Sequence, residues 1–434
     1  MADLEMSKER ISCDAPTLVD PQDIPEPAID RAKDAVEGGL EGWLTVLGAF
    51  LLLFCSFGQL NAFGTFQAYY ADHQLKHMSP SAISWIGSLQ LWIFFFSGGF
   101  IGRLFDEYGP RVLMLPGTLL LVLSIMITSV SSSYYEFLFI QGFLFGLGVG
   151  LVFYPSLAAV STHFSRYRGT ALGIAIAGSG AGGLVYPIMF QRLFSEVGFG
   201  WAVRISGFFC LALCAVALAF VTRRKPEQKQ PRPWFDLKLL KDTHFMLVVG
   251  SSFFISFEQG LFVPNFYIVE YATARSVSST MAFYVLAIMN GASIFGRLAP
   301  PFLSDALGRF NLIVPCAFLS GLLALALWTT ARGLPAIIVF SVLYGFVSGG
   351  FNALIIPCVV QISGAHEIGT RVGMLYTLIS FSSMGGGPAA GALLHTMGGS
   401  FTGVAALIGA SMIFGSFLLL WARLSIQPKI WARI

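Results

Sequence analysis

The chain has 434 residues, of which 55% are hydrophobic and only 11% are charged, and its formal net charge is +3. Its mean hydropathy of +0.73 is too high for a soluble domain, which cannot bury that much apolar surface. These values exclude an ordinary soluble protein. They indicate a membrane protein whose partner is the lipid bilayer and not nucleic acid.

Apolar runs recur along the chain at lengths near the roughly 20 residues that cross a bilayer as a helix. The runs are continuous, whereas barrel strands alternate apolar and polar residues, so helices are expected. We predict an all-α membrane protein with twelve transmembrane helices in two pseudo-symmetric six-helix halves. The predicted spans are 44–69, 82–104, 112–131, 135–162, 169–191, 201–222, 244–270, 279–303, 312–330, 335–361, 370–394 and 400–422.

Polar segments divide the chain. Residues 1–41 lack an apolar core segment, so they are predicted to be a polar tail and not a cleavable signal peptide. The segment TRRKPEQKQPRPWFDLKLLKD is basic, contains three prolines and separates the sixth span from the seventh. The predicted organisation is an N-terminal half at 42–222, a linker at 223–243, a C-terminal half at 244–423 and a tail at 424–434.

The positions of lysine and arginine predict the orientation. Most bases after the tail fall in loops on the side of the linker, and cytoplasmic loops carry an excess of such bases. The tail, the linker and both termini are therefore expected in the cytoplasm, in a multi-pass protein of the plasma membrane. The bases expected toward the opposite side are Lys76, Arg192, Arg204, Arg275 and Arg332.

One short pattern occurs twice, as GRLFDEYGPR at 102–111 and as GRLAPPFLSDALGRF at 296–310. Each copy ends the second predicted helix of its half, and each places an acid three residues before a glycine, followed by a base. Acid and base can pair across such a turn at the membrane surface, which predicts a conformational latch. Its members are Gly102, Asp106, Gly109, Arg111, Asp305, Gly308 and Arg309.

The first copy resembles the G-x-x-x-D-x-x-G-x-R loop signature of the major facilitator superfamily, and the 6+6 arrangement with a basic linker is similar throughout. Within it, the stretches at 37–50, 165–187 and 296–311 resemble the monocarboxylate porter family, especially its fungal branch. The resemblance implies a secondary transporter with alternating access and a site near the midplane between the halves. It implies no cofactor.

Arg297 is the first candidate for that site. When Asp106 and Asp305 are aligned, Arg297 lies opposite Gly98, eight residues before the loop acid, and so roughly 12 Å deeper in the helix. A cation at that depth usually marks a substrate or ion pathway. The alternative is a cation that extends to the interface or forms a structural pair.

Glu258 is the candidate for proton coupling. It lies near the middle of the seventh predicted span, where a charged carboxylate is costly, and Pro264 weakens the helix just beyond it. The alternative is a structural glutamate that is hydrogen-bonded to a neighbouring helix.

Other polar groups inside predicted spans are candidates for substrate contact, although each is equally interpretable as a hydrogen bond between helices. They are Asn61, Tyr154, Tyr186, Asn290 and Asn352. The GSGAGG run at 178–183 matches a dinucleotide fingerprint, but it lies within a predicted helix, so helix packing is expected instead. The cysteines have no zinc-type spacing, so no metal is expected.

Two departures limit what the resemblance transfers. Animal monocarboxylate porters carry a lysine where this chain has Asn61 and an aspartate where it has Ser293. Their charge set for proton-linked lactate transport is therefore not reproduced.

The sequence predicts a secondary active transporter of a small organic acid or amphipathic metabolite, with proton coupling left open. Metabolite efflux and monocarboxylate-like transport both fit. No phosphate-binding loop and no clustered catalytic residues occur, so neither ATP drive nor an enzyme is expected. An importer of a vitamin-like nutrient and a non-transporting membrane sensor remain the alternatives.

Overall fold

The computed structural model describes residues 38–164, 167–223, 237–256, 263–363 and 368–429, and the regular structure in these ranges is helical. The N-terminal part contains α2 (Gly39–Cys55), α3 (Phe57–Asn61), α4 (Phe63–Asp72), α5 (Pro80–Tyr108), α6 (Pro110–Thr128), α7 (Tyr134–Phe137), α8 (Phe145–His163), α9 (Arg168–Glu196) and α10 (Gly198–Phe220). The C-terminal part contains α11 (Thr243–Ser256), α12 (Val263–Ala274), α13 (Ser279–Leu307), α14 (Arg309–Leu323), α15 (Leu334–Gln361), α16 (Ile368–Thr396) and α17 (Thr402–Ile426).

Ten segments of the described chain are long and apolar enough to cross a membrane, which confirms an all-helical membrane protein. The sequence predicted twelve. The difference lies at the seventh predicted span, where α11 is a shorter apolar helix. It lies also at the eleventh, because serine and glycine residues lower the apolar content of the 29-residue α16.

The first span is divided into α2, α3 and α4 by two local breaks. At Ser56 the backbone has φ −88° and ψ −76°, and the Ser56 hydroxyl donates to the Leu52 carbonyl at 2.6 Å. A serine that bonds back to its own helix in this way tends to bend it. A second non-helical residue, Ala62, separates α3 from α4 and follows Asn61 directly.

Glycines make the tight turns in both copies of the repeated pattern. Gly109 joins α5 to α6 with φ 81°, and Gly308 joins α13 to α14 with φ 94°. Only glycine adopts these angles without a steric penalty from Cβ. This explains why the two patterns share a glycine at that position.

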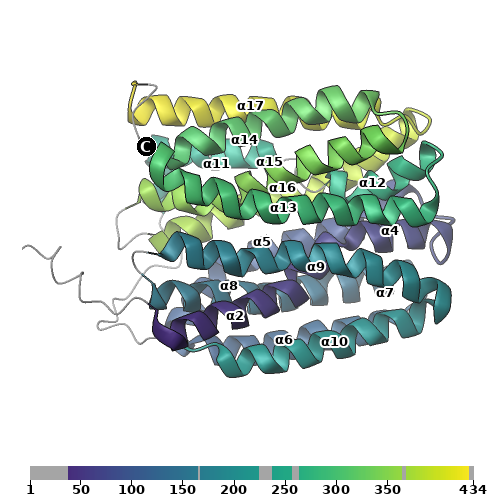
Figure 1. Ribbon diagram of the computed structural model, residues 1–434, viewed down its shortest axis with the longest axis horizontal. Coiled ribbons are helices and arrows are strands. Elements are labelled where there is room, and N and C mark those ends of the chain that lie inside the picture. Colours follow the sequence, from purple (N-terminus) through teal and green to yellow (C-terminus); the bar gives the residue numbers. More distant parts are fainter. Residues whose placement is uncertain (1–37, 165–166, 224–236, 257–262, 364–367, 430–434) are drawn as a thin grey trace, which may run out of the picture. The chain divides into compact units, whose positions relative to one another are not determined.

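Three pairs of helices join the N-terminal and C-terminal parts: α5 packs on α16, α9 packs on α13, and α4 packs on α12. In Figure 1 the labelled helices from α2 to α10 run alongside those from α11 to α17, with their axes along the same general direction. We call the end of the bundle that holds Arg223 and Leu237 the linker face, because these residues flank the connection between the parts. The other end is the far face.

The α5–α16 seam is closely packed from one face to the other. Near the linker face, a Cβ on Gly373 would lie 3.2 Å from the Cα of Gly99. Near the far face, the Ser81 hydroxyl donates to the Pro388 carbonyl at 2.9 Å. The far face is closed further by α12, where the Tyr267 hydroxyl donates to the Gly387 carbonyl at 3.1 Å.

Candidate functional site

Arg297 lies in the interior of the bundle, where α3, α9 and α13 meet. Its side chain is only 4% exposed, and its Nη1 donates a short hydrogen bond to the Ser179 hydroxyl. The Asn61 amide donates to the Ser179 carbonyl at 3.3 Å. Ser179 therefore connects two of the predicted site residues, and we call Arg297, Ser179, Asn61 and Asn290 the Arg297 site.

The sequence of α13 places its polar residues on one side. Asn290, Ser293 and Arg297 follow one another at spacings of three and four, which is the spacing of one helix face. The Ser293 hydroxyl donates to the Asn290 carbonyl at 2.7 Å, and the Asn290 amide donates to the Leu286 carbonyl at 3.2 Å. Asn290 therefore shares the face of Arg297 but bonds within its own helix.

Glycines of α9 allow this face to approach closely. A Cβ on Gly183 would lie 2.8 Å from Asn290 Cγ, and one on Gly180 would lie 2.7 Å from Ile294 Cγ1. Gly178 and Gly182 face α2 instead, where added Cβ atoms would collide with backbone carbonyl oxygens. The prediction that the GSGAGG run serves helix packing is confirmed, because its glycines line two separate interfaces.

Two buried polar atoms of the site have no hydrogen-bond partner within the described chain: Nε of Arg297 and Oδ1 of Asn61. Buried polar atoms are usually satisfied, and leaving one unpaired costs roughly 1–3 kcal/mol. Across the described ranges, Arg297 also has no ion pair with a carboxylate. An anionic ligand would satisfy both the charge and the free Nε.

Tyr154 belongs to a separate aromatic cluster. It stacks on Phe94 with ring centroids 5.2 Å apart and contacts Tyr376 of α16 at 5.8 Å. Gly98 makes room for its ring, because an added Cβ would overlap the tyrosine. Its hydroxyl has no hydrogen-bond partner among the described residues, so Tyr154 offers an unpaired polar group at the junction of α5, α8 and α16.

Tyr186 of α9 packs against α2 and α10. It is fully buried between α2, α9 and α10, with its hydroxyl 4.0 Å from Cys210 Sγ and its ring 5.5 Å from that of Phe54. Its predicted contact with substrate stays a prediction, but this geometry is that of a packing residue. Asn352 is half-buried on α15.

The same region contains a cysteine cluster that the sequence did not reveal. The Sγ atoms of Cys55, Cys210 and Cys214 lie within 4.8 Å of one another, and all three side chains are buried. Cys210 and Cys214 are one helical turn apart, which was a usable signal, but Cys55 is distant in the sequence. Their setting is that of small apolar residues between α2 and α10.

The latch residues lie at the linker face. Arg309 donates to the Pro357 carbonyl at 3.3 Å, whereas Arg111 is exposed and Gly102 borders open space. The side chains of Asp106 and Asp305 are outside the described set, as is Glu258 altogether. Their predicted roles in the latch and in proton coupling therefore stay predictions.

Sequence reasoning missed two arginines that brace these turns. Arg223, just after α10, donates to the Phe105 carbonyl at 2.8 Å and lies over the Phe105 ring at 4.8 Å. In the C-terminal part, Arg423 of α17 donates to Asn311 Oδ1 at 2.9 Å. Arg223 therefore connects the end of α10 to the region of the Gly109 turn, and Arg423 connects α17 to the region of the Gly308 turn. The two parts thus share this arginine contact as well as the glycine turn.

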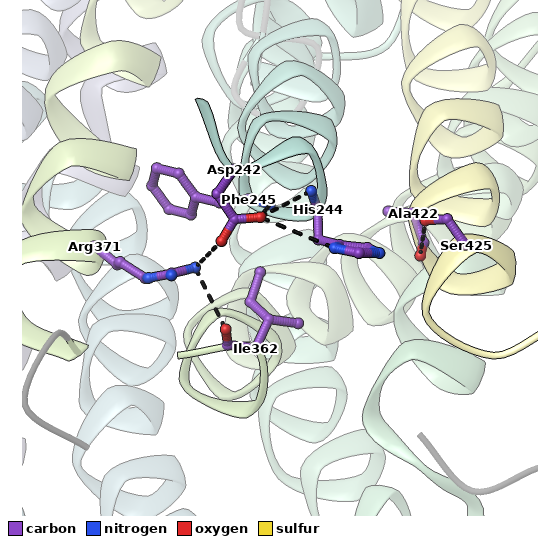
Figure 2. A network of polar contacts seen from close by, with 7 residues as sticks. All are labelled: Asp242, His244, Phe245, Ile362, Arg371, Ala422 and Ser425. Carbon is purple, nitrogen blue, oxygen red and sulfur yellow. Dashed lines mark hydrogen bonds and ion pairs between the residues drawn. The ribbon is translucent and has the colours of Figure 1, made fainter. Parts of the chain in front are cut away.

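An ion pair ties the start of α11 to α16 at the linker face (Figure 2). Arg371 Nη1 lies 2.7 Å from Asp242 Oδ2 and also donates to the Ile362 carbonyl at 3.3 Å. The other Asp242 oxygen accepts the backbone amides of His244 and Phe245. Burial alone would raise the pKa of Asp242, but the amide of Phe245, Arg371 and the amide of His244 together lower it below its ordinary value.

Comparisons with known proteins agree on the family. The profile of the Major Facilitator Superfamily matches residues 49–332. The chain is 39% identical to the MFS transporter asaE of Aspergillus flavus, covering 91% of this chain and 89% of the relative. It is 38% identical to the aspyridones efflux protein apdF of Emericella nidulans, covering 96% and 84%.

Two further comparisons extend this result. The chain is 38% identical to the agnestins efflux protein AgnL12 of Paecilomyces divaricatus, covering 89% of this chain and 88% of the relative. Among solved structures, the nucleoside transporter NupG superposes with a TM-score of 0.65 at 14% identity, covering 88% of this chain and 99% of that one. At that identity the likeness shows the fold alone.

Proposed function

Because the chain belongs to the Major Facilitator Superfamily and is therefore a multi-pass membrane transporter and not an enzyme, we propose that it exports an amphipathic organic anion by alternating access. The observation that carries this proposal is Arg297, a buried cation with a free Nε and no carboxylate partner in the described chain. A planar guanidinium recognises carboxylates and related anions through parallel hydrogen bonds. Efflux is supported by relatives named for the export of aspyridones and agnestins.

The residues around Arg297 define how the anion binds. Nη1 is held by Ser179, so Nε is left to face a ligand, and Asn61 Oδ1 can accept a hydrogen bond from a ligand hydroxyl. Because Asn61 belongs to α3 and Arg297 to α13, the ligand contacts the N-terminal and C-terminal parts together. A ligand held by both parts can be transferred when one rocks against the other.

We propose that the linker face is cytoplasmic, that α11 and α12 complete one span and that α16 provides another, which gives twelve. The closed far face then corresponds to an inward-facing or occluded conformation. In this orientation the Asp106 and Asp305 turns form the cytoplasmic latch, and Asp106→Asn slows transport without loss of binding. Labelling of a cysteine at position 229 from outside intact cells would contradict the orientation.

Transport by membrane vesicles tests the proposal. Inside-out vesicles from cells that express the chain should accumulate an acidic amphipathic metabolite, and right-side-out vesicles should not. Arg297→Lys keeps the charge but loses the planar geometry, so it should retain a small part of the activity, and Arg297→Gln should retain none. Equal accumulation by the wild type and both variants would assign Arg297 to scaffolding.

The direction of transport across the vesicle membrane distinguishes export from its alternative, import of a vitamin-like nutrient. If only right-side-out vesicles accumulate substrate, the chain is an importer with the same anion site. If neither orientation transports any member of an acidic metabolite panel, the sensor alternative gains support. Assignment to the monocarboxylate porter branch and proton coupling through Glu258 stay predictions, and both are tested by a pH gradient in the same vesicles.

A further inference from the structure

The α9–α13 seam contains an apolar opening that the proposed site does not use. A cavity of about 320 Å³ lies between the two helices near the linker face. We call it the side groove and define it by Gly169, Thr170 and Gly173 of α9 and Phe295, Leu298 and Phe302 of α13. Its volume falls at the lower end of the roughly 300–1,000 Å³ that small-molecule pockets occupy.

The groove exists because α9 and α13 separate toward the linker face. Near the centre, added Cβ atoms on Gly180 and Gly183 would overlap α13 at 2.7 and 2.8 Å. At Gly173 a Cβ would meet only the Arg297 carbonyl at 3.6 Å, and at Gly169 it would meet nothing within 4 Å. The two helices are therefore in tight contact at the Arg297 site and farther apart between that site and the linker face.

Among the described residues, the α5–α16 seam does not share this opening. This seam remains closed at the same level, where Phe95 stacks on Tyr376 with ring centroids 5.6 Å apart and Gly99 contacts Gly373. The outer wall of the groove is apolar and uncovered, since Phe295 is 67% exposed and Phe302 is 75% exposed. In a membrane-spanning helix, such side chains face the hydrocarbon of the bilayer.

The groove lies next to the Arg297 site on the same seam. Gly173 lines the groove, and a Cβ on Gly173 would contact the backbone carbonyl of Arg297 at 3.6 Å. The Arg297 guanidinium instead bonds to Ser179, which is six residues and so about 9 Å farther along α9. One amphipathic molecule that binds Arg297 through its charged group and extends about 9 Å along the seam therefore reaches the groove with its apolar tail.

Resting on the function proposed above, we propose that the side groove binds the apolar part of the exported anion and admits that anion from the bilayer leaflet beside the linker face. Apolar walls favour a hydrocarbon or aromatic tail over a polar solute, and the Arg297 cation farther along the same seam favours an anion over a neutral lipid. The substrate class is thus an acid with a membrane-soluble body.

Photolabelling in lipid nanodiscs tests the groove directly. The probe is a dodecanoate that carries a diazirine at its tail end, and the matched control probe is its methyl ester. With the intact chain, the acid should label the peptide that contains Phe295, Leu298 and Phe302. The ester has the same tail but no charge, so its labelling of that peptide should be about tenfold lower.

Two variants and one control locate the binding. Gly173→Leu fills the groove without a backbone collision and should reduce acid labelling about tenfold, as should Arg297→Gln, which removes the anchor. Gly250→Leu places the same side chain on α11, where a Cβ also meets nothing within 4 Å, and should leave labelling unchanged. Thermal unfolding of each variant checks that it is folded.

The remaining outcomes overturn the inference. Equal labelling by acid and ester, or undiminished labelling in Arg297→Gln, would show that ordinary bilayer lipid fills the groove. Labelling confined to other helices would show that the tail binds elsewhere. Transport by vesicles distinguishes failure of the groove inference from failure of the proposed function. Labelling of the groove without any transport would refute export but not the groove. Transport that is unchanged in Gly173→Leu would refute the groove but not export.

Discussion

The contact between Gly183 and Asn290 predicts that Gly183→Ala changes the balance between conformations. The new Cβ would lie 2.8 Å from Asn290 Cγ and 3.1 Å from its Cβ, so rotation of the asparagine cannot relieve the overlap. Ordinary carbon contacts begin at about 3.5 Å, so the 3.1 Å approach to Asn290 Cβ requires α9 and α13 to separate by roughly 0.4 Å. Overpacking of this kind costs about 1–3 kcal/mol.

That cost applies to the conformation in which the seam is closed. The gain in helix propensity from alanine applies to both conformations and cancels. A strain of about 1.4 kcal/mol therefore changes the ratio of open to closed seams about tenfold. Spin labels on cysteines at Ser195 of α9 and Thr280 of α13, both exposed near the far face, report the separation as a distance distribution.

Gly183→Ala should enlarge the long-distance population about tenfold relative to the parent labelled pair. Gly250→Ala is the control, because its Cβ meets open space and should leave the distribution unchanged. An identical distribution in both variants, with Gly183→Ala fully folded, would refute the reasoning that this seam opens during transport.

Three further predictions follow from contacts at the two faces. Because the fold lowers the pKa of Asp242, its stabilising contribution is present above the ordinary carboxyl pKa and is lost as pH falls through the lowered value. Acidification should therefore lower the melting temperature of the parent chain more than that of Asp242→Asn. Melting temperatures that fall in parallel with pH would contradict this. Tyr267→Phe removes the hydrogen bond to Gly387, so the far face should open more readily by about 1 kcal/mol, measured as faster labelling of a cysteine at Ser81. Gly109→Ala places a Cβ at φ 81° and should destabilise the fold by about 1–2 kcal/mol, whereas Gly102→Ala, in open space, should not; equal melting temperatures would contradict the turn assignment.

The sequence was sufficient for features that depend on local pattern. Continuous apolar runs predicted the helical membrane fold, and the repeated acid-x-x-glycine spacing identified the turns at Gly109 and Gly308. The packing role of the glycines at 178–183 also followed, because that run lies inside a helix.

Features that join distant segments could not be read from the sequence. Ser179 is the partner of both Arg297 and Asn61, yet a serine in a transmembrane helix gives no signal of its own. The sequence places Tyr186 inside a membrane span, but the helices that its ring contacts depend on where α2 and α10 pack. The Asp242–Arg371 ion pair joins residues on α16 and before α11, whose proximity only the tertiary fold provides.

The central claim is that the transported molecule is an anion held by Arg297. It is tested most directly by comparing how inside-out vesicles accumulate an acid and its methyl ester. Both members of the pair share one amphipathic body, so size and hydrophobicity are matched and only the charge differs. The account predicts that vesicles containing the parent chain accumulate the acid and not the ester, and that Arg297→Gln abolishes the difference by losing the acid. Accumulation of the ester at the same rate as the acid, unaffected by Arg297→Gln, would contradict it.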